Sequence, residues 1–244
     1  GPGELLQKYG TDAQKKKYLS RLASGEDIPC FALTGPLTGS DATSMSDKGV
    51  ICKKKINGKD VLGLSLTFDK RYITLAPVAT LIGLAIDVID PDNLLKNNKN
   101  KLGITVCLLK ASTKGVKIGD YHLPLHVKFD NGVISGKNVF VPLDNIIGGE
   151  DYIGKGWEML TDCLAEGRAL SLPALSSASC IASYISSLSY TILRQQFKRS
   201  IIDFPGVGAK VAKISAFSFM IESLREFALI PVSKDLKPSI ISAM

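Results

Sequence analysis

The sequence predicts an α+β fold in which a β-rich unit lies between helical segments. Between Pro29 and Leu143, short runs rich in Val, Ile, Thr and Phe alternate with turn-forming residues, as strands of a barrel or sandwich do. Before and after this stretch the apolar residues recur every three or four positions, which is typical of one face of a helix. We therefore expect a middle β domain flanked by helical segments.

Composition limits the class of protein. The chain has 244 residues, of which 45% are hydrophobic, so it can bury a sizeable core and is not disordered. Lys and Arg outnumber Asp and Glu by 30 to 23, and the net charge of +7 either favours anionic partners or only maintains solubility. The lysine-rich runs 15–17, 53–55 and 96–101 lack interleaved aromatic residues, which argues against a nucleic-acid groove.

Cysteine usage and hydropathy predict a soluble protein of a reducing compartment. The five cysteines are an odd number without a C-x-x-C pair, so we expect no disulfide framework and a cytoplasmic location. No secretory signal opens the sequence, and the apolar run ITLAPVATLIGLAI is interrupted by Pro77. This run is shorter than the roughly 20 apolar residues that a membrane span needs.

The first helix is expected over residues 4–24, where Thr11 and Gln14 form a T-x-x-Q capping box. Turn signals at Asn57-Gly58, 91–93 and Asn131-Gly132 then separate the expected strands. The strands are expected at 30–34, 49–56, 61–68, 72–76, 78–89, 103–111, 126–130 and 138–143.

After the β-rich stretch, residues 156–197 predict one long helix or two, with Pro173 as the expected kink. Another helix is expected from Pro205 onward. Both helices have apolar or small-residue faces that need partners, so we expect a fragment or a chain completed by another subunit. The predicted domains are 1–28 (end of a helical domain), 29–150 (middle β domain) and 151–244 (start of a second helical domain).

A loop of small and hydroxylic residues follows the first strand, in CFALTGPLTGSDATS (30–44). Glycines let a backbone approach a ligand closely, and hydroxyls with free amides can bind its oxygen atoms. The same residue types also suit an ordinary loop that closes a barrel. The loop is either a binding site for the edge of a cofactor or an ordinary connection between strands. Other motifs in the sequence are needed to distinguish these two interpretations.

Five segments, in order along the chain, resemble the acyl-CoA dehydrogenase family and within it the long bacterial branch of fatty-acid oxidation. Residues 30–44 resemble the family segment T-E-P-x-x-G-S-D, with Gly35 in place of the glutamate. The other segments are YGTDAQKKKYL (9–19), similar to the helix before the β domain, KRYITLA (70–76), similar to W-I-T, LAEGR (164–168), and RQQF (194–197), similar to R-x-x-F. The resemblance implies an acyl-CoA dehydrogenase-like fold with incomplete helical domains.

The resemblance implies an FAD site. Thr34, with neighbouring main-chain amides, would meet the flavin ring, Thr74 would offer its hydroxyl to flavin N5, and Tyr72 would replace the usual tryptophan. Arg194 would reach the pyrophosphate of FAD in a neighbouring subunit, which implies a homo-oligomer. The implied cofactor-binding residues are Phe31, Ala32, Leu33, Thr34, Gly39, Ser40, Tyr72, Ile73, Thr74, Arg194, Gln196 and Phe197.

The implied activity is α,β-dehydrogenation of fatty acyl-CoA to trans-2-enoyl-CoA, with an electron-transfer flavoprotein or similar acceptor. Ser40 and Arg168 would contact the substrate, whereas Ala165 and Phe204-Pro205 depart from the family pattern at CoA and cofactor positions. The catalytic carboxylate is expected beyond the end of this chain, so the chain alone is expected to be inactive; Glu166 is the candidate within it. Inner-membrane attachment would need segments outside this sequence.

Other readings remain open. The chain could be a non-catalytic relative that binds flavin or acyl-CoA or acts as a subunit partner, or a basic interaction module without a cofactor. Phe31, Leu33 and Ile73 alternate as in any half-buried strand, and Arg194 alone would suit a solvated helix end. No metal site is expected, because His122 and His126 supply too few ligands and the acidic residues at 87, 90 and 92 lack a calcium-loop pattern.

Overall fold

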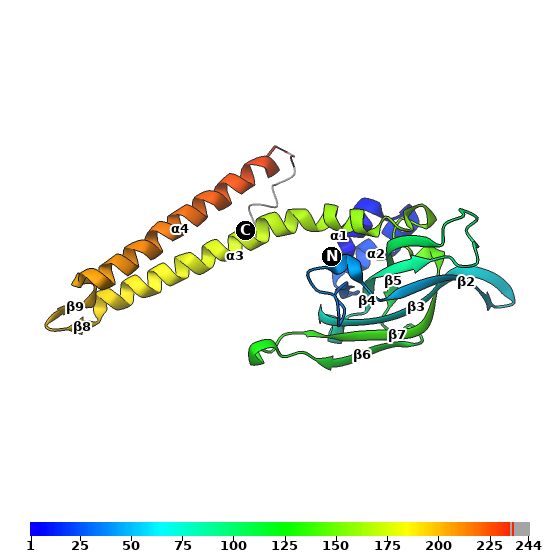
Figure 1. Cartoon of the computed structure of the whole chain (residues 1–244), viewed down its shortest axis with the longest axis horizontal. Coiled ribbons are helices and arrows are strands. Elements are labelled where there is room, and N and C mark those ends of the chain that lie inside the picture. The colour runs from blue at the N-terminus through cyan, green and yellow to red at the C-terminus, as the bar shows by residue number, and fades with distance from the viewer. Residues whose placement is uncertain (235, 237–244) are drawn as a thin grey trace. The chain divides into compact units, whose positions relative to one another are not determined.

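The structure is a computed structural model, and it describes residues 1–234 and 236, except for the side chains of residues 165 and 166. The chain divides into two compact units, residues 1–161 and 162–244 (Figure 1). The first contains the sheet together with the N-terminal helices, and the second contains most of a helical hairpin. The three-domain division made from the sequence stays a prediction.

Two helices replace the single helix expected over residues 4–24. They are α1 (Pro2–Tyr9) and α2 (Asp12–Ser24). The capping box is present, since the Thr11 hydroxyl accepts a hydrogen bond from Gln14 N at 3.3 Å and Gln14 Oε1 accepts one from Thr11 N at 3.1 Å. Because an N-cap residue adopts an extended backbone, the box ends one helix and starts the next. The motif was identified correctly, but its position inside a continuous helix was wrong.

A curled, seven-stranded mixed sheet forms the body of the first unit (Figure 1). The strand order is β1-β4-β2-β3-β7-β6, and β5 pairs with β4. β4 is parallel to β1 and β2, and the other pairs are antiparallel. The strands are β1 (Pro29–Ala32), β2 (Lys48–Ile56), β3 (Lys59–Thr74), β4 (Leu81–Ile89), β5 (Lys101–Lys110), β6 (Val116–Tyr121) and β7 (Asn131–Pro142).

Strand alternation builds the core on one face of this sheet. Leu64, Leu66 and Phe68 of β3 are buried at every second position, as strand geometry requires. They pack with buried residues of β4, β5 and β7 in one hydrophobic cluster. The Asn57-Gly58 turn has φ of 49° and 78°, so it joins β2 to β3 as the tight hairpin that the sequence predicted.

Three expectations for the sheet were wrong, and one strand was missed. The runs 61–68 and 72–76, expected as separate strands, are parts of the single strand β3. Residues 126–130 form no strand, because Leu125 and His126 have φ of 53° and 58° and turn the backbone away from an extended course. Asn131-Gly132 begins β7 instead of forming a turn. The segment Val116–Tyr121, which was not predicted, is β6. Its largely exposed side chains leave it without the apolar alternation by which a strand is recognised.

The second unit is a helical hairpin. α3 (Gly156–Leu193) starts at the end of the first unit and continues through Pro173, so the sequence alternative of one long helix is the one observed. A small hairpin of β8 (Gln195–Gln196) and β9 (Arg199–Ser200) leads to α4 (Pro205–Val232). Ser218 Oγ donates to Cys180 O at 3.1 Å, and Ser177 donates to Glu222. These bonds fix the register of the two helices.

Large apolar side chains stay exposed on this hairpin, among them Phe219 and Phe227. By length and composition alone, α3 is also long and apolar enough to cross a membrane, a test that core helices of soluble bundles pass as well. Short 3₁₀ turns complete the chain at Ala42–Ser44, Ala76–Val78, Pro124–His126, Leu143–Asn145, Glu150–Tyr152 and Ile201–Asp203.

Candidate functional site

The structure brings together the two segments that were predicted to meet a cofactor ring. β1 ends at Ala32, and the backbone of Thr34 then accepts a hydrogen bond from Arg71 N at 3.0 Å. Lys70 Nζ donates to the neighbouring carbonyl of Leu33 at 2.8 Å. These contacts tie residues 33–34 to the end of β3, although 37 residues separate Leu33 from Lys70 in the sequence.

Residues of these two segments differ in what they expose. Ala32 and Ile73 are 0% and 2% exposed, so both residues are buried within the core. Phe31, Leu33 and Thr34 are half-buried, whereas Tyr72 and Thr74 are exposed. Strand alternation suggested that Phe31 and Ile73 are ordinary core residues. Ile73 is such a residue, whereas Phe31 is only half-buried.

Several polar groups at the site have no partner among residues 1–234 and 236. They include the backbone N–H and hydroxyl of Thr34 and the hydroxyl of Thr74. Gly39 and Ser40 are exposed on the following loop, which is held by mutual backbone bonds between Gly35 and Thr38 at 3.1 and 3.4 Å. The site thus offers hydrogen-bond donors from rigid elements, and they are free to meet a ligand.

Tyr72 is held by a residue that the sequence did not connect with it. Its backbone has φ of 57°, and its N–H donates to His122 Nδ1 at 3.2 Å. The two rings lie 4.6 Å apart and tilted by 45°, while the Arg71 guanidinium lies 5.3 Å from the phenol ring. Tyr72 remains 55% exposed, so one part of its ring is still available. His122 therefore belongs to this site, and no local sequence pattern could indicate it.

A buried ion pair lies directly behind the site. Lys70 is 0% exposed, and its Nζ is 2.7 Å from Asp47 Oδ2. Asp47 Oδ1 also accepts a hydrogen bond from Asp69 N at 2.8 Å. Burial lowers the pKa of Lys70, and the adjacent Asp47 carboxylate opposes that shift. The sequence could have predicted the burial of Lys70, because Lys70 continues the alternating buried series Leu64, Leu66, Phe68 on β3.

The remaining predicted site residues lie in the second unit. Arg194, Gln196 and Phe197 are exposed in and before the β8–β9 hairpin, and Phe197 has φ of 52°. Its ring contacts Phe204 edge-on at 5.9 Å. Arg168 is exposed on α3. The side chain of Glu166, the catalytic candidate, lies outside the described residues.

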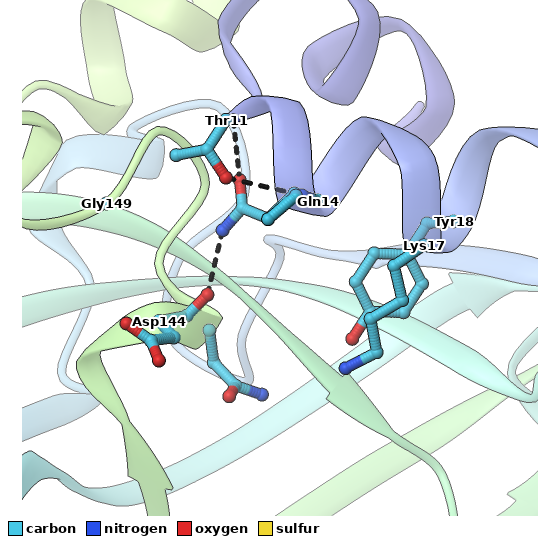
Figure 2. A pocket seen from close by; sticks show the side chains of 8 residues that line it. Thr11, Gln14, Lys17, Tyr18, Asp144 and Gly149 are labelled. Carbon is cyan, nitrogen blue, oxygen red and sulfur yellow. Dashed lines mark hydrogen bonds between the residues drawn. The ribbon is translucent and has the colours of Figure 1, made fainter.

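A cavity of about 370 Å³ lies between α2 and the segment after β7 (Figure 2). Figure 2 shows the Gln14 amide inside it, pointing from α2 toward Asp144. That amide already makes four hydrogen bonds, so its polar atoms are not free for a ligand. The residues lining this cavity are Thr11, Ala13, Gln14, Lys17, Tyr18, Asp144, Asn145 and Gly149.

A more apolar cavity of about 480 Å³ is lined by Tyr121, Leu123, Lys128, Phe129 and Asp130. Neither cavity is lined by a residue of the predicted site. Within the described part of the chain, no group of three or more His, Cys, Asp or Glu side chains is placed to hold a metal ion.

Comparison with known proteins finds sequence relatives over most of the chain. Protein HemX of Proteus mirabilis is 52% identical over 88 residues, which are 36% of this chain and 51% of that protein. The mitochondrial very long-chain specific acyl-CoA dehydrogenase of Bos taurus is 28% identical over 219 residues, which are 88% of this chain and 31% of that protein. The chain therefore spans only a third to a half of these relatives. No family model matches the sequence.

Solved structures show the same fold. Acyl-CoA dehydrogenase from Geobacillus kaustophilus superimposes with a TM-score of 0.78 at 22% identity, covering 96% of this chain and 57% of that one. Acyl-CoA dehydrogenase complexed with FAD from Bacillus anthracis gives 0.70 at 25% identity, covering 89% of this chain and 34% of that one. The chain is therefore similar in sequence over 88% of its length, and in fold, to acyl-CoA dehydrogenases.

Proposed function

We propose that this chain forms the central part of an FAD-dependent acyl-CoA dehydrogenase that converts fatty acyl-CoA to trans-2-enoyl-CoA. The observation that carries the proposal is the meeting of residues 33–34 with Lys70 and Arg71 near the end of β3. The Thr34 N–H and the hydroxyls of Thr34 and Thr74 have no partner among the described residues and are free to donate. Similarity to very long-chain specific acyl-CoA dehydrogenase, and to the Bacillus anthracis acyl-CoA dehydrogenase complexed with FAD, supports the same interpretation.

The chemistry of this donor set fits a flavin ring. The ring carries carbonyl oxygens and nitrogens along one edge, which accept hydrogen bonds of the kind that Thr34 and Thr74 can donate. The exposed part of the Tyr72 ring offers an aromatic surface, and the Gly39-Ser40 loop offers amides and a hydroxyl for phosphate. Bound FAD would supply the acceptor for the hydride, which carries both electrons away from the substrate.

The protein residues would contribute placement. Thr34 and Thr74 would orient the ring, Ser40 would lie between cofactor and acyl-CoA, and Arg168 would lie near the thioester. The carboxylate that removes the α-proton is Glu166 or a residue beyond Met244, and we favour the latter. Arg194 would act across a subunit boundary, so we also propose a homo-oligomer. A flavoprotein would take the electrons, and the cytoplasm is the proposed location.

The test is flavin binding by the full-length protein, measured as flavin absorbance and fluorescence titration with FAD. In the double variant T34V/T74V two hydrogen bonds of about 1 kcal/mol each are lost, so FAD should bind about 30-fold more weakly. The control is Thr113→Val, since the Thr113 hydroxyl lies in the turn after β5 and has no partner among the described residues. A wild-type protein without flavin affinity, or an unaffected double variant, contradicts the proposal.

A specific observation favours the second candidate, a non-catalytic relative that binds flavin or acyl-CoA. Gly35 stands where the family has glutamate, and it is buried in the loop, where a Cβ would lie 3.1 Å from Thr38 Oγ1 and 3.3 Å from Asp69 O. A glutamate there would also bring a second carboxylate near Asp47. The packing of this loop therefore favours the glycine over the glutamate of the family segment. Dye reduction with acyl-CoAs of graded length separates the two: flavin binding without turnover at any length identifies the non-catalytic relative.

A further inference from the structure

The Lys70–Asp47 pair is buried where folding alone does not require charges. Lys70 is fully buried, and Asp47 is 5% exposed. Removing two charges from water costs about as much as their attraction returns, and apolar pairs of the same shape often stabilise a fold equally well. A second feature therefore has to explain why this sheet holds a cation at that point.

That feature is the further contact of the ammonium group. Lys70 Nζ is fixed by Asp47 Oδ2 at 2.7 Å and donates to Leu33 O at 2.8 Å. The Leu33 carbonyl belongs to the same peptide group as the Thr34 N–H, and the N–H points the opposite way in a trans peptide. A cation bonded to the carbonyl both fixes the orientation of this peptide and polarises it, which makes its N–H a stronger donor.

The Thr34 N–H finds no acceptor among residues 1–234 and 236, and Thr34 is only half-buried, so this strengthened donor is available to a ligand. We propose that Lys70, held by Asp47, is a positioning residue that orients and polarises the Leu33–Thr34 peptide toward an electron-rich acceptor on the cofactor. The inference rests on the proposed flavin site. A donor strengthened in this way favours the reduced, more electron-rich flavin over the oxidised form.

Three double variants of the full-length protein test this role. K70M/D47N removes both charges, so no unpaired ion stays buried, and the amide oxygen introduced by D47N can still accept from Asp69 N–H. K70Q/D47N also removes both charges, but it keeps an amide donor for Leu33 O. The matched control, K48M/D87N, removes another Lys–Asp pair of the same sheet, which joins β2 to β4 at 2.5 Å and is partly exposed.

The measurements are FAD affinity, the flavin midpoint potential and the thermal melting curve of each variant. K70M/D47N should bind FAD about tenfold more weakly, and its reduced form should lose about tenfold more affinity than its oxidised form. That ratio corresponds to a midpoint potential lower by about 30 mV for a two-electron couple. K70Q/D47N should recover much of the affinity but keep the lowered potential, because orientation is restored without charge. K48M/D87N should match the wild type.

A purely structural role for Lys70 would change melting temperature without moving the potential of the bound flavin. Unchanged potential and affinity in both Lys70 variants, with flavin bound to the wild type, overturns the inference alone. Absence of flavin binding by the wild type overturns the proposed function and this inference with it. If K70M/D47N does not fold, K70Q/D47N still decides, because it keeps the hydrogen bonds of the pair.

Discussion

Replacing Gln14 with alanine should destabilise the protein strongly. Its side-chain amide makes four hydrogen bonds: Nε2 donates to Asp144 O at 2.8 Å and to Ile146 O at 2.6 Å, and Oε1 accepts from Thr11 N and Gly148 N at 3.1 Å. In Gln14→Ala the Ile146 carbonyl keeps its bond from Gly149 N at 2.9 Å, but the part-buried Gly148 N–H loses its partner. A buried polar group left unsatisfied costs about 1–3 kcal/mol. Adding the lost capping contact gives an expected loss of about 3 kcal/mol in the free energy of unfolding.

Urea denaturation of matched variants separates the two contributions. Thr11→Ala removes only the capping hydroxyl and should cost about 1 kcal/mol. Gln7→Ala changes an exposed glutamine on α1 and should cost less than about 0.5 kcal/mol. The difference between Gln14→Ala and Thr11→Ala measures the link from α2 to the segment after β7 shown in Figure 2. If the two variants are equally stable, that link contributes nothing and the reasoning is wrong.

The pKa directions lead to two more predictions. Burial raises the pKa of the Cys30 and Cys107 thiols to about 12. An alkylating reagent at about pH 8 should therefore leave both thiols unmodified in the native protein and label both after unfolding. Mass spectrometry measures the labelling, and modification of Cys107 in the native protein contradicts the prediction. Hydrogen bonds from Arg225 and Ser177 lower the pKa of Glu222 from 4.5 to about 2. Its stabilising contribution is therefore complete above about pH 4.5 and lost as the pH falls toward 2, and Glu222→Gln should flatten this part of the pH dependence of urea unfolding.

Local patterns were sufficient for most of the fold. Strand-like runs of apolar residues predicted β2, β4 and β5, and predicted β3 as two separate strands. Asn57-Gly58 predicted the hairpin between β2 and β3, because only a few residue pairs tolerate its positive φ values. The period of three and four residues predicted α4 from Pro205 onward. The α+β class and the acyl-CoA dehydrogenase-like fold, which followed from five motifs in order, are confirmed.

The parts that failed depend on contacts between distant residues. Asn131-Gly132 has the composition of a turn, but pairing with Ile73 and Thr74 draws it into β7. His122 touches Tyr72 across 50 residues of sequence. Lys70 and Asp47 meet only after β3 has formed, and charged residues are ordinarily assigned to the surface. The roles of the site residues stay a prediction.

Because Lys70 and Arg71 reach back to Leu33 and Thr34, the ligand-facing groups exist in the right place only when the sheet has closed. Ligand binding at this site and folding of the first unit are therefore thermodynamically linked. A molecule that fills the site raises the melting point in proportion to the logarithm of its concentration above Kd. Thermal unfolding measured with each candidate ligand can therefore rank the ligands by affinity without an assay of turnover.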